Sequence, residues 1–342
     1  MRAAGEASVD RTGDPLEEST AASPGGTATD STENLPVAVD RPLVSDGLRR
    51  PVLAASDLDR TLIYSGKAAR LGLPPGTRLR ESPLFEDLVC VEMYDHKPLS
   101  HVTRAALASI TRLAELGVLV PATTRTRAQY RRISLPGPPV PYAVTANGGF
   151  LLVDGETDDD WTRQVERELA TSSHPFAEVQ QYMADTFRPE FTSKLRNAEE
   201  LFCYAVVDRD GLPDGFVDEV SGWAAAHGWR ASLQGRKLYV VPVGLRKGAA
   251  VAEVARRVGA DTVLAAGDSL LDAEMLESAT RAVRPAHGEL HEVGWQTAGL
   301  VVTSTAGATG GQEVAQWLLD ETLAVLSGSG VDHAAALGSG SL

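Results

Sequence analysis

The sequence has few cysteines and lacks any long apolar run. Cys90 and Cys203 are the only two cysteines among 342 residues, and each lies in an apolar stretch. We expect both to be buried, reduced thiols, because free cysteine packs as a small hydrophobic residue. No Cys-x-x-Cys pair or Cys/His metal spacing occurs. With no segment apolar enough to cross a bilayer and no signal-peptide core at the start, the sequence predicts a cytoplasmic protein without a membrane partner.

Positive charge is also in deficit. The net charge is -14, which argues against a nucleic-acid partner. An acidic chain also repels a phosphate-bearing ligand at long range, so a phosphate site has to be built locally from cations and backbone amides. Apolar residues make up 43% of the sequence, which is enough for a packed core. The length suggests one large or two moderate domains.

The two ends of the chain differ from its middle. Residues 1–48 and 327–342 are rich in small and polar residues and carry few large apolar ones. Segments of this composition cannot bury enough surface to offset the entropy of ordering. Both are therefore predicted to be disordered tails.

Between the tails, apolar runs of strand length alternate with stretches of helical spacing. Such alternation predicts an α/β fold, with a Rossmann-like parallel sheet covered by helices on both faces. Ser100 is the expected N-cap of the first long helix. The predicted elements of this sheet domain are strands at residues 52–56, 118–122, 142–145, 263–266 and 300–303, and helices at residues 100–116 and 312–326.

The stretch of residues 154–238 has a different pattern, in which helices and strands no longer alternate one by one. We interpret this stretch as a small α+β domain inserted into the sheet domain. The sheet domain then consists of residues 49–153 and 239–326. The predicted elements of the insert are helices at residues 162–171, 175–187 and 216–227, and strands at residues 201–207, 229–233 and 237–241.

Polar side chains follow the first two predicted strands of the sheet domain. Asp57 and Asp59 lie in the segment DLDRTL, directly after the strand at residues 52–56. One carboxylate can act as a nucleophile while the other handles protons, if their surroundings separate their pKa values. Thr123 follows the next strand, where a hydroxyl can donate a hydrogen bond to a phosphate oxygen. In parallel sheets such chemistry lies beyond the carboxyl ends of the strands.

A lysine and a second aspartate pair complete the pattern. Lys247 precedes a helix of apolar periodicity, and its ammonium can neutralise an aspartate and a phosphate at once. Asp268 and Asp272 lie in the segment GDSLLD after a later strand, and two hard oxygen ligands of this kind suit Mg²⁺. Each motif alone is common in ordinary turns and surfaces. In this order, each beyond an apolar run, they supply a nucleophile, an acid/base, a phosphate clamp and a metal site.

On these motifs the chain resembles the haloacid dehalogenase-like (HAD) superfamily, over about residues 52–319. The insert enters after the segment NGG at residues 147–149 and returns before Lys247. This position resembles the C2-capped branch, which includes Cof-type sugar phosphatases and sucrose-phosphate-phosphatase-like enzymes. Arg60 stands where the DxDGT turn of the family usually has a glycine. Thr124 stands where a glycine commonly separates the hydroxyl residue from Arg125.

The resemblance implies a role for each motif residue. Asp57 is implied to be the nucleophile and Asp59 the general acid/base. The implied substrate-binding residues are Thr123, Thr124, Arg125, Asn147 and Lys247. The implied Mg²⁺ site consists of Asp57, Asp59 through its backbone carbonyl, Asp268 and, in support, Asp272.

Two further groups of residues carry weaker signals. His287 and His291 have the spacing of one helix face, but no third ligand lies near them in the sequence, so no metal pair is predicted. A run of arginines after Thr123 could anchor an anionic substrate or form an exposed helix surface, and both readings stay open. These arginines are Arg125, Arg127, Arg131 and Arg132.

The sequence therefore predicts a Mg²⁺-dependent phosphatase that hydrolyses a small phosphomonoester through an aspartyl-phosphate. The expected partner is a phosphorylated metabolite, either a sugar phosphate or a nucleotide-like compound. A phosphomutase with the same chemistry is one alternative. A non-catalytic phosphometabolite-binding module is another, although binding alone needs no nucleophile. The sequence carries no signal for the oligomeric state.

Overall fold

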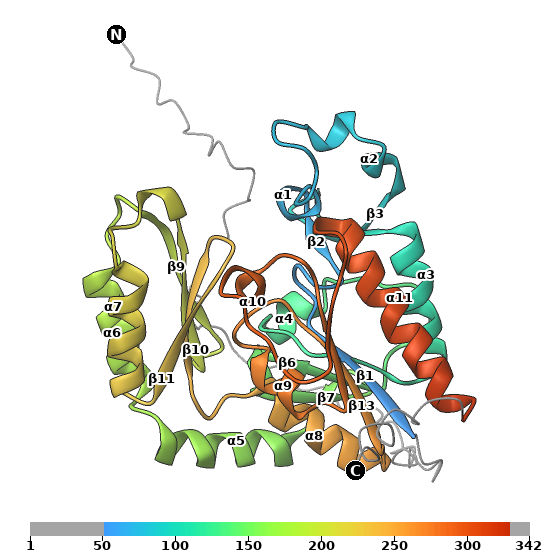
Figure 1. The fold of residues 1–342 in the computed structure, drawn as a ribbon. Helices are drawn as coiled ribbons and strands as arrows, with labels where there is room; N and C mark the ends of the chain where they lie inside the picture. Colours follow the sequence, from blue (N-terminus) through green and yellow to red (C-terminus); the bar gives the residue numbers. More distant parts are fainter. Residues whose placement is uncertain (1–50, 329–342) are drawn as a thin grey trace, which may run out of the picture.

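The computed structural model describes residues 51–328, and the two predicted tails lie outside the described residues, apart from residues 327–328. Two parts of different architecture lie side by side (Figure 1): a core around a parallel sheet and a cap around an antiparallel sheet. The predicted α/β fold with an added α+β cap is therefore confirmed. No helix in the described range is long and apolar enough to cross a membrane.

The core sheet has five parallel strands in the order β15-β14-β13-β1-β5. They are β1 (Val52–Ser56), β5 (Leu119–Pro121), β13 (Thr262–Ala266), β14 (Arg281–Arg284) and β15 (Leu300–Val302). Every residue of β1 is buried, because a central strand covered on both faces has no solvent side for polar residues. β1 and β13 pair in register along their length, so both strands end at the same edge of the sheet.

Helices cover both faces of the core sheet (Figure 1). Alternate residues of β1 join different clusters: Val52 and Ala54 pack in the cluster of α3 and α11, whereas Leu53 and Ala55 belong to the cluster of α8 and α9. The core helices are α3 (Arg104–Glu115), α8 (Lys247–Val258), α9 (Ala273–Ser278) and α11 (Gly307–Leu326), with two short helices, α4 (Arg127–Tyr130) and α10 (Glu289–Glu292).

A small antiparallel sheet continues the core beyond β5. It consists of β6 (Tyr142–Thr145), β7 (Phe150–Val153) and β8 (Glu156–Thr157). A parallel bridge between Ala122 and Val144 joins β6 to the edge of the core sheet. The turn after β6 brings Asn147 next to the end of β5, where its backbone N–H donates to the carbonyl of Thr123 at 2.9 Å.

The cap follows β8. Its sheet has four antiparallel strands in the order β11-β12-β10-β9, and α6 and α7 lie on the side away from the core (Figure 1). The cap elements are α5 (Asp159–Ser172), α6 (Phe176–Thr186), α7 (Phe216–Ala226), β9 (Thr192–Ala198), β10 (Phe202–Val207), β11 (Trp229–Gln234) and β12 (Lys237–Pro242). β12 runs past residue 238, where the predicted insert ends. The division of the chain into these two domains stays a proposal.

A flap, residues 64–103, lies between the Asp57 turn and α3. It contains β2 (Tyr64–Ser65), α1 (Gly66–Ala69), α2 (Leu84–Asp87), β3 (Leu88–Tyr94) and β4 (Lys97–Thr103). The expected helix start at Ser100 is wrong, because Ser100 lies within β4, which pairs with β3. The helix begins at Arg104, and the hydroxyl of Thr103 caps it by accepting from the backbone N–H of Ala106 at 3.2 Å.

Other differences from the sequence analysis have simple physical causes. β9 was missed because alternate residues of this edge strand are exposed, which leaves no apolar run. β14 was missed because an arginine stands at each end of its four residues. α11 begins five residues earlier than expected. The sequence analysis missed its first turns because they are rich in glycine, which is unfavourable in helices. Cys203 is buried as expected, but Cys90 is exposed, since it lies on the β3–β4 hairpin of the flap.

Gly148 lies against the backbone of Arg246, where the chain segment before the cap meets the segment after it. There is no room for a side chain at this position. Its φ is 100°, and a Cβ at this position would lie 2.3 Å from the carbonyl oxygen of Arg246. We expect Gly148→Ala to lower the free energy of unfolding by about 3 kcal/mol, because backbone atoms have to move. Gly155→Ala is the matched control, since Gly155 has a φ of 85° but no atom within 4 Å of the added Cβ, and should cost about 1 kcal/mol. Denaturant unfolding measures both, and equal losses would contradict the contact.

Candidate active site

The predicted site residues meet at the carboxyl edge of the core sheet. Asp57 follows β1, Thr123 lies just beyond β5 and Asp268 lies just beyond β13, while Lys247 is the first residue of α8. All four side chains are buried. The structure thus brings together residues that lie far apart in the sequence, because parallel strands end at one edge.

Lys247 forms the centre of the site. Its Nζ lies 2.6 Å from Oδ1 of Asp57 and 2.6 Å from Oδ1 of Asp272, and the side chain is 1% exposed. Burial works against the charged ammonium, but Asp272 and Asp57 outweigh it and raise the pKa of Lys247. Burial raises the pKa of Asp57 to about 7, and the charge of Lys247 opposes that rise. The ammonium therefore favours the ionised form of Asp57.

Asp57, Asp268 and Asp272 form an acidic cluster that fits a divalent cation. One ligand oxygen from each lies within 4.8 Å of the others, and all three residues are buried. Burial raises the pKa of Asp268 well above its usual value, and its Oδ2 has no hydrogen-bond partner among residues 51–328. The three carboxylates repel one another at this distance, and a second positive charge beside Lys247 would offset that repulsion. Three hard oxygen ligands suit Mg²⁺.

Asp272 is held in place by the loop that carries Asp268. Its Oδ2 accepts hydrogen bonds from the backbone N–H of Asp268 at 3.2 Å, and from the backbone N–H and hydroxyl of Ser269 at 2.9 and 2.7 Å. Its Oδ1 accepts from Lys247. With both oxygens engaged, Asp272 orients the metal loop and the lysine, which agrees with a supporting role.

Asp59 lies outside the acidic cluster and is held by Arg125. The guanidinium donates from Nε to Oδ2 at 2.6 Å and from Nη2 to Oδ1 at 2.8 Å. Burial alone would raise the pKa of Asp59, but the charge and hydrogen bonds of Arg125 outweigh burial and lower this pKa to about 2. The side chain of Asp59 therefore has a charge partner of its own, and the metal role implied for it is confined to its backbone carbonyl.

Glu92 of the flap forms a second ion pair with Arg125. The sequence analysis missed this residue. Glu92 is 1% exposed, and its Oε1 lies 2.8 Å from Nη1 of Arg125 and 3.2 Å from Nε of Arg132. Its Oε2 accepts from the hydroxyl of Ser100 at 2.6 Å. The signal in the sequence was a single acid within the apolar run LVCVEMY, which by itself does not reveal its partners.

The other predicted substrate-binding residues have structural partners. Thr123 is fully buried, and its hydroxyl oxygen accepts from the backbone N–H of Arg125 at 3.1 Å. Thr124 is hydrogen bonded to Tyr239 of the cap. Asn147 adopts a left-handed φ of 58° and donates from Nδ2 to the carbonyl of Leu245 at 2.8 Å. Asn147 thus ties together the two chain crossings, and its role toward a substrate stays a prediction.

His287 contacts the turn that carries Asp57 and Asp59. Its Nε2 lies 2.8 Å from the carbonyl oxygen of Arg60, and its Nδ1 accepts from the backbone N–H of Gly307 at 3.1 Å. Burial lowers the pKa of His287 to about 4, so the ring is neutral with its proton on Nε2. His291 instead contacts Arg284, with 3.0 Å between Nδ1 and Nη1.

The arginines after Thr123 divide between the two expectations. Arg125 lies in the site, whereas Arg127 pairs with Glu199 of the cap at 2.9 Å and Arg131 contacts the carbonyl of Gly155 at 3.4 Å. The cap also touches the core through Glu289, whose Oε1 accepts from the backbone N–H of Leu233 at 2.7 Å. The cap is therefore bound to the core at two separate places, through Glu199 and through Leu233.

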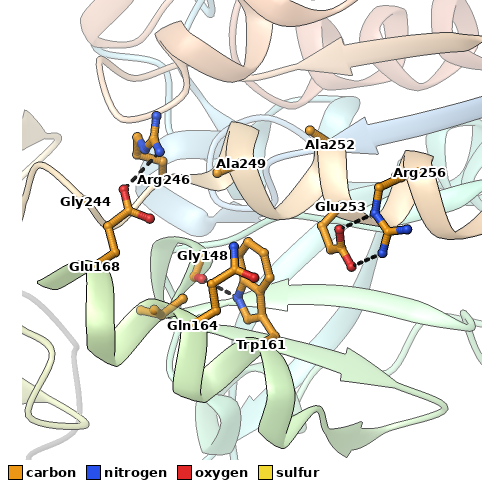
Figure 2. A pocket seen from close by; sticks show the side chains of 11 residues that line it. Gly148, Trp161, Gln164, Glu168, Gly244, Arg246, Ala249, Ala252, Glu253 and Arg256 are labelled. Atoms are coloured by element: carbon orange, nitrogen blue, oxygen red, sulfur yellow. Dashed lines mark hydrogen bonds and ion pairs between the residues drawn. The ribbon is translucent and has the colours of Figure 1, made fainter.

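A pocket outside this cluster lies between α5 and α8 (Figure 2). Trp161 and Glu168 line it from α5, and Glu253 and Arg256 line it from α8. The indole of Trp161 points to Gly148 and donates to its carbonyl at 2.8 Å. No predicted catalytic residue lines this pocket, so it is distinct from the predicted phosphate site.

Comparisons with known proteins agree in part. No family model matches the chain. Among curated proteins, the chain is similar to a phosphoglycolate phosphatase of Aeropyrum pernix, with 29% identity over 269 residues that cover 78% of this chain and 93% of that protein. Among solved structures, it is similar to the sucrose-phosphatase of Synechocystis sp. PCC6803, in complex with sucrose and phosphate, with a TM-score of 0.53, 14% identity, and coverage of 79% of this chain and 98% of that one.

A HAD subclass IIB sugar phosphatase also matches, with a TM-score of 0.47, 14% identity, and coverage of 78% of this chain and 98% of that one. The likeness to the sucrose-phosphatase extends over core and cap together, since it covers most of both chains. The chain therefore has the fold of this sucrose-phosphatase over both core and cap, and its similarity to a curated phosphatase agrees with the resemblance that its motifs indicate.

Proposed function

We propose that this chain is a Mg²⁺-dependent phosphatase that hydrolyses a small phosphomonoester through a phosphoryl group carried on Asp57. The observation that carries the proposal is the buried arrangement of Asp57, Lys247 and Asp268 at one edge of the sheet. A curated relative is named a phosphoglycolate phosphatase, and a structural neighbour a sucrose-phosphatase. Both names support a small phosphorylated metabolite as the substrate.

Asp57 acts as the nucleophile in this proposal. Lys247 donates to Oδ1 of Asp57, which orients the carboxylate and favours its ionised form. Attack on phosphorus forms the bond from Asp57 to the phosphoryl group while the ester oxygen leaves. The hydroxyl of Thr123 and the ammonium of Lys247 bind the phosphoryl oxygens as their charge develops. Water then attacks the phosphorus, and Asp57 is regenerated.

Asp59 gives its proton to the leaving oxygen and later takes a proton from water. In the structure Arg125 holds Asp59 ionised, with its pKa lowered to about 2 despite burial. A general acid needs a pKa nearer the working pH. The proposal therefore requires Arg125 to release Asp59 when a substrate binds, for example by turning its donors toward the phosphoryl group.

Asp57, Asp268 and the backbone carbonyl of Asp59 would hold Mg²⁺, with Asp272 in support. When bound, the ion supplies positive charge that offsets the repulsion between the carboxylates and the phosphoryl group. The cap excludes water from the site, which strengthens each of these electrostatic interactions. The cytoplasmic location expected from the sequence stays a prediction.

Removal of the nucleophile should abolish turnover. We expect Asp57→Asn to lower kcat at least about a thousandfold, because the amide cannot form the phosphoryl bond. Release of inorganic phosphate from a panel of metabolites measures the effect. Asp185→Asn, on the exposed surface of α6, is the matched control and should keep full activity. Turnover of Asp57→Asn near the wild-type rate, or transfer of phosphate between esters without net release, would contradict the proposal.

Removal of the metal should have a comparable effect. In excess EDTA we expect phosphate release to fall below about a hundredth of its rate, and added Mg²⁺ should restore it, because the acidic cluster repels the substrate without a cation. Titration calorimetry gives a second readout, in which Asp268→Asn binds Mg²⁺ at least about tenfold more weakly than the wild type. The proposal fails if the metal-stripped protein retains full activity.

The charge of Arg125 should set the pKa of Asp59. In the metal-free protein, Arg125→Gln removes the cation that favours the carboxylate, so the pKa of Asp59 should rise from about 2 by at least about one unit. A carboxyl ¹³C NMR titration measures it. Arg132→Gln is the control, because Arg132 pairs with Glu92 and should leave Asp59 nearly unchanged. An unshifted pKa in Arg125→Gln would show that another group sets the charge of Asp59.

A further inference from the structure

The cap sheet has two faces of opposite character. Residues directly opposite on paired strands share a face, and on one face Cys203, Ala205 and Val240 join the apolar cluster that contains α6 and α7. The strand registers place Lys194, Arg196, Arg230 and Lys237 together on the other face. Within β9 to β12, as the structure describes them, that face carries no aspartate or glutamate. In a chain of net charge -14, this basic cap face is a local exception.

The basic cap face is turned toward the core. Arg230 donates from Nη2 to the carbonyl of Leu245 at 2.8 Å, and the hydroxyl of Ser232 donates to Glu289 at 2.5 Å. Tyr239 is hydrogen bonded to Thr124, next to the predicted phosphate-binding hydroxyl. Helices α6 and α7 lie on the outer side of the sheet (Figure 1). The face that carries these cations is thus the core side of the cap sheet.

Lys237 is the cation of this face whose charge acts on Asp59 of the core. Its Nζ lies 5.5 Å from the ring centroid of Tyr204. Its side chain forms no ion pair with any acid in residues 51–328, and Lys237 is exposed. A cation held beside an aromatic ring and left without an acid is available to an anionic ligand.

Arg60 supplies a second cation from the core side. Its Nε lies 3.3 Å from Oδ2 of Asp268 but makes no hydrogen bond there. Its Nη1 would lie 2.8 Å from a Cβ at Gly235, so the guanidinium reaches the turn between β11 and β12 of the cap. A cation bound at Asp268 would compensate that carboxylate and leave Arg60 to face the leaving group.

We infer that Lys237 and Arg60 form an anion subsite for the leaving group, so that the substrate is a phosphomonoester whose leaving group carries a second anionic group, a carboxylate or a phosphate. This inference rests on the proposed phosphatase function. A neutral polyol would need acceptors as well as donors, and the basic cap face offers no carboxylate to accept from its hydroxyls. A charge-assisted contact discriminates between an anion and a hydroxyl.

Steady-state kinetics on three esters of similar size tests the inference. The probes are glycerol 3-phosphate, 3-phosphoglycerate and 1,3-propanediol bisphosphate, whose leaving groups end in a hydroxymethyl, a carboxylate and a phosphate. The wild type should prefer one of the two anionic esters to glycerol 3-phosphate by at least about tenfold in kcat/KM. The preferred anion identifies the chemistry of the second group. Equal rates on all three esters would overturn the inference.

Variants locate the subsite. Lys237→Met should reduce the preference about tenfold, through KM. Lys237→Arg should keep most of the preference. Lys67→Met, exposed on α1, removes the same charge elsewhere and should change nothing. A preference that survives Lys237→Met intact would exclude Lys237 from the subsite.

A binding measurement separates this inference from the proposed function. Titration calorimetry on full-length Asp57→Asn protein with Mg²⁺ compares the affinities of the same three esters without turnover. The preferred anionic ester should bind at least about tenfold more tightly than glycerol 3-phosphate, and Lys237→Met in this background should remove the difference. If the wild type hydrolyses none of the esters, the phosphatase proposal fails, while the binding result still decides the subsite. Equal affinities overturn the subsite whatever the kinetics show.

Discussion

The ammonium group of Lys247 neutralises the buried acids at the carboxyl edge of the core sheet, and the rest of the site depends on this interaction. Two buried aspartates from different loops, Asp57 and Asp272, each place an oxygen 2.6 Å from this ammonium. A buried carboxylate without a cation is costly, and a buried ammonium without acids is equally so. The start of α8 is therefore tied to the ends of β1 and β13, and the geometry of the site follows from this triad.

The same rule of local pairing extends outward from Lys247. Arg125 is placed between Asp59 and Glu92, and Arg60 lies beside Asp268. Each of these acids thus has a cation beside it, with Lys247 shared by Asp57 and Asp272, and local cations of this kind would let a strongly acidic chain receive a phosphate. The pairing leaves Asp57 with a pKa raised to about 7 by burial and Asp59 with a pKa lowered to about 2 by Arg125. The proposed chemistry needs the opposite order, with the lower pKa on Asp57 and the higher pKa on Asp59. Binding of metal and substrate therefore has to separate Asp59 from Arg125 and add positive charge beside Asp57.

The sequence predicted the parts of the fold whose signal is local. β1, β5 and β13 are short, mainly apolar runs, and a parallel sheet brings the polar residues after such runs to one edge, so Asp57, Thr123 and Asp268 could be placed together. Lys247 was found because it begins a helix of clear periodicity. Strands with exposed alternate residues, such as β9, and the flap strand β4 had no such signal.

The contacts that depend on tertiary structure could not be predicted. Glu92 lies 33 positions before Arg125 on a separate hairpin, and nothing in the spacing of the two residues pairs them. Lys237 and Tyr239 meet the core only because the cap sheet turns one face toward it. The residues that we infer to select the substrate belong to this second class, which explains why the sequence indicated a reaction more clearly than a substrate.

The central claim is that Asp57 carries the phosphoryl group. Rapid acid quench of the full-length protein with a ³²P-labelled phosphomonoester and Mg²⁺, followed by peptide mapping, tests it most directly. The account predicts transient, hydroxylamine-sensitive label on the peptide that contains Asp57, appearing before free phosphate. Steady release of phosphate with no label on the protein, or label on a different residue such as a histidine, would contradict it.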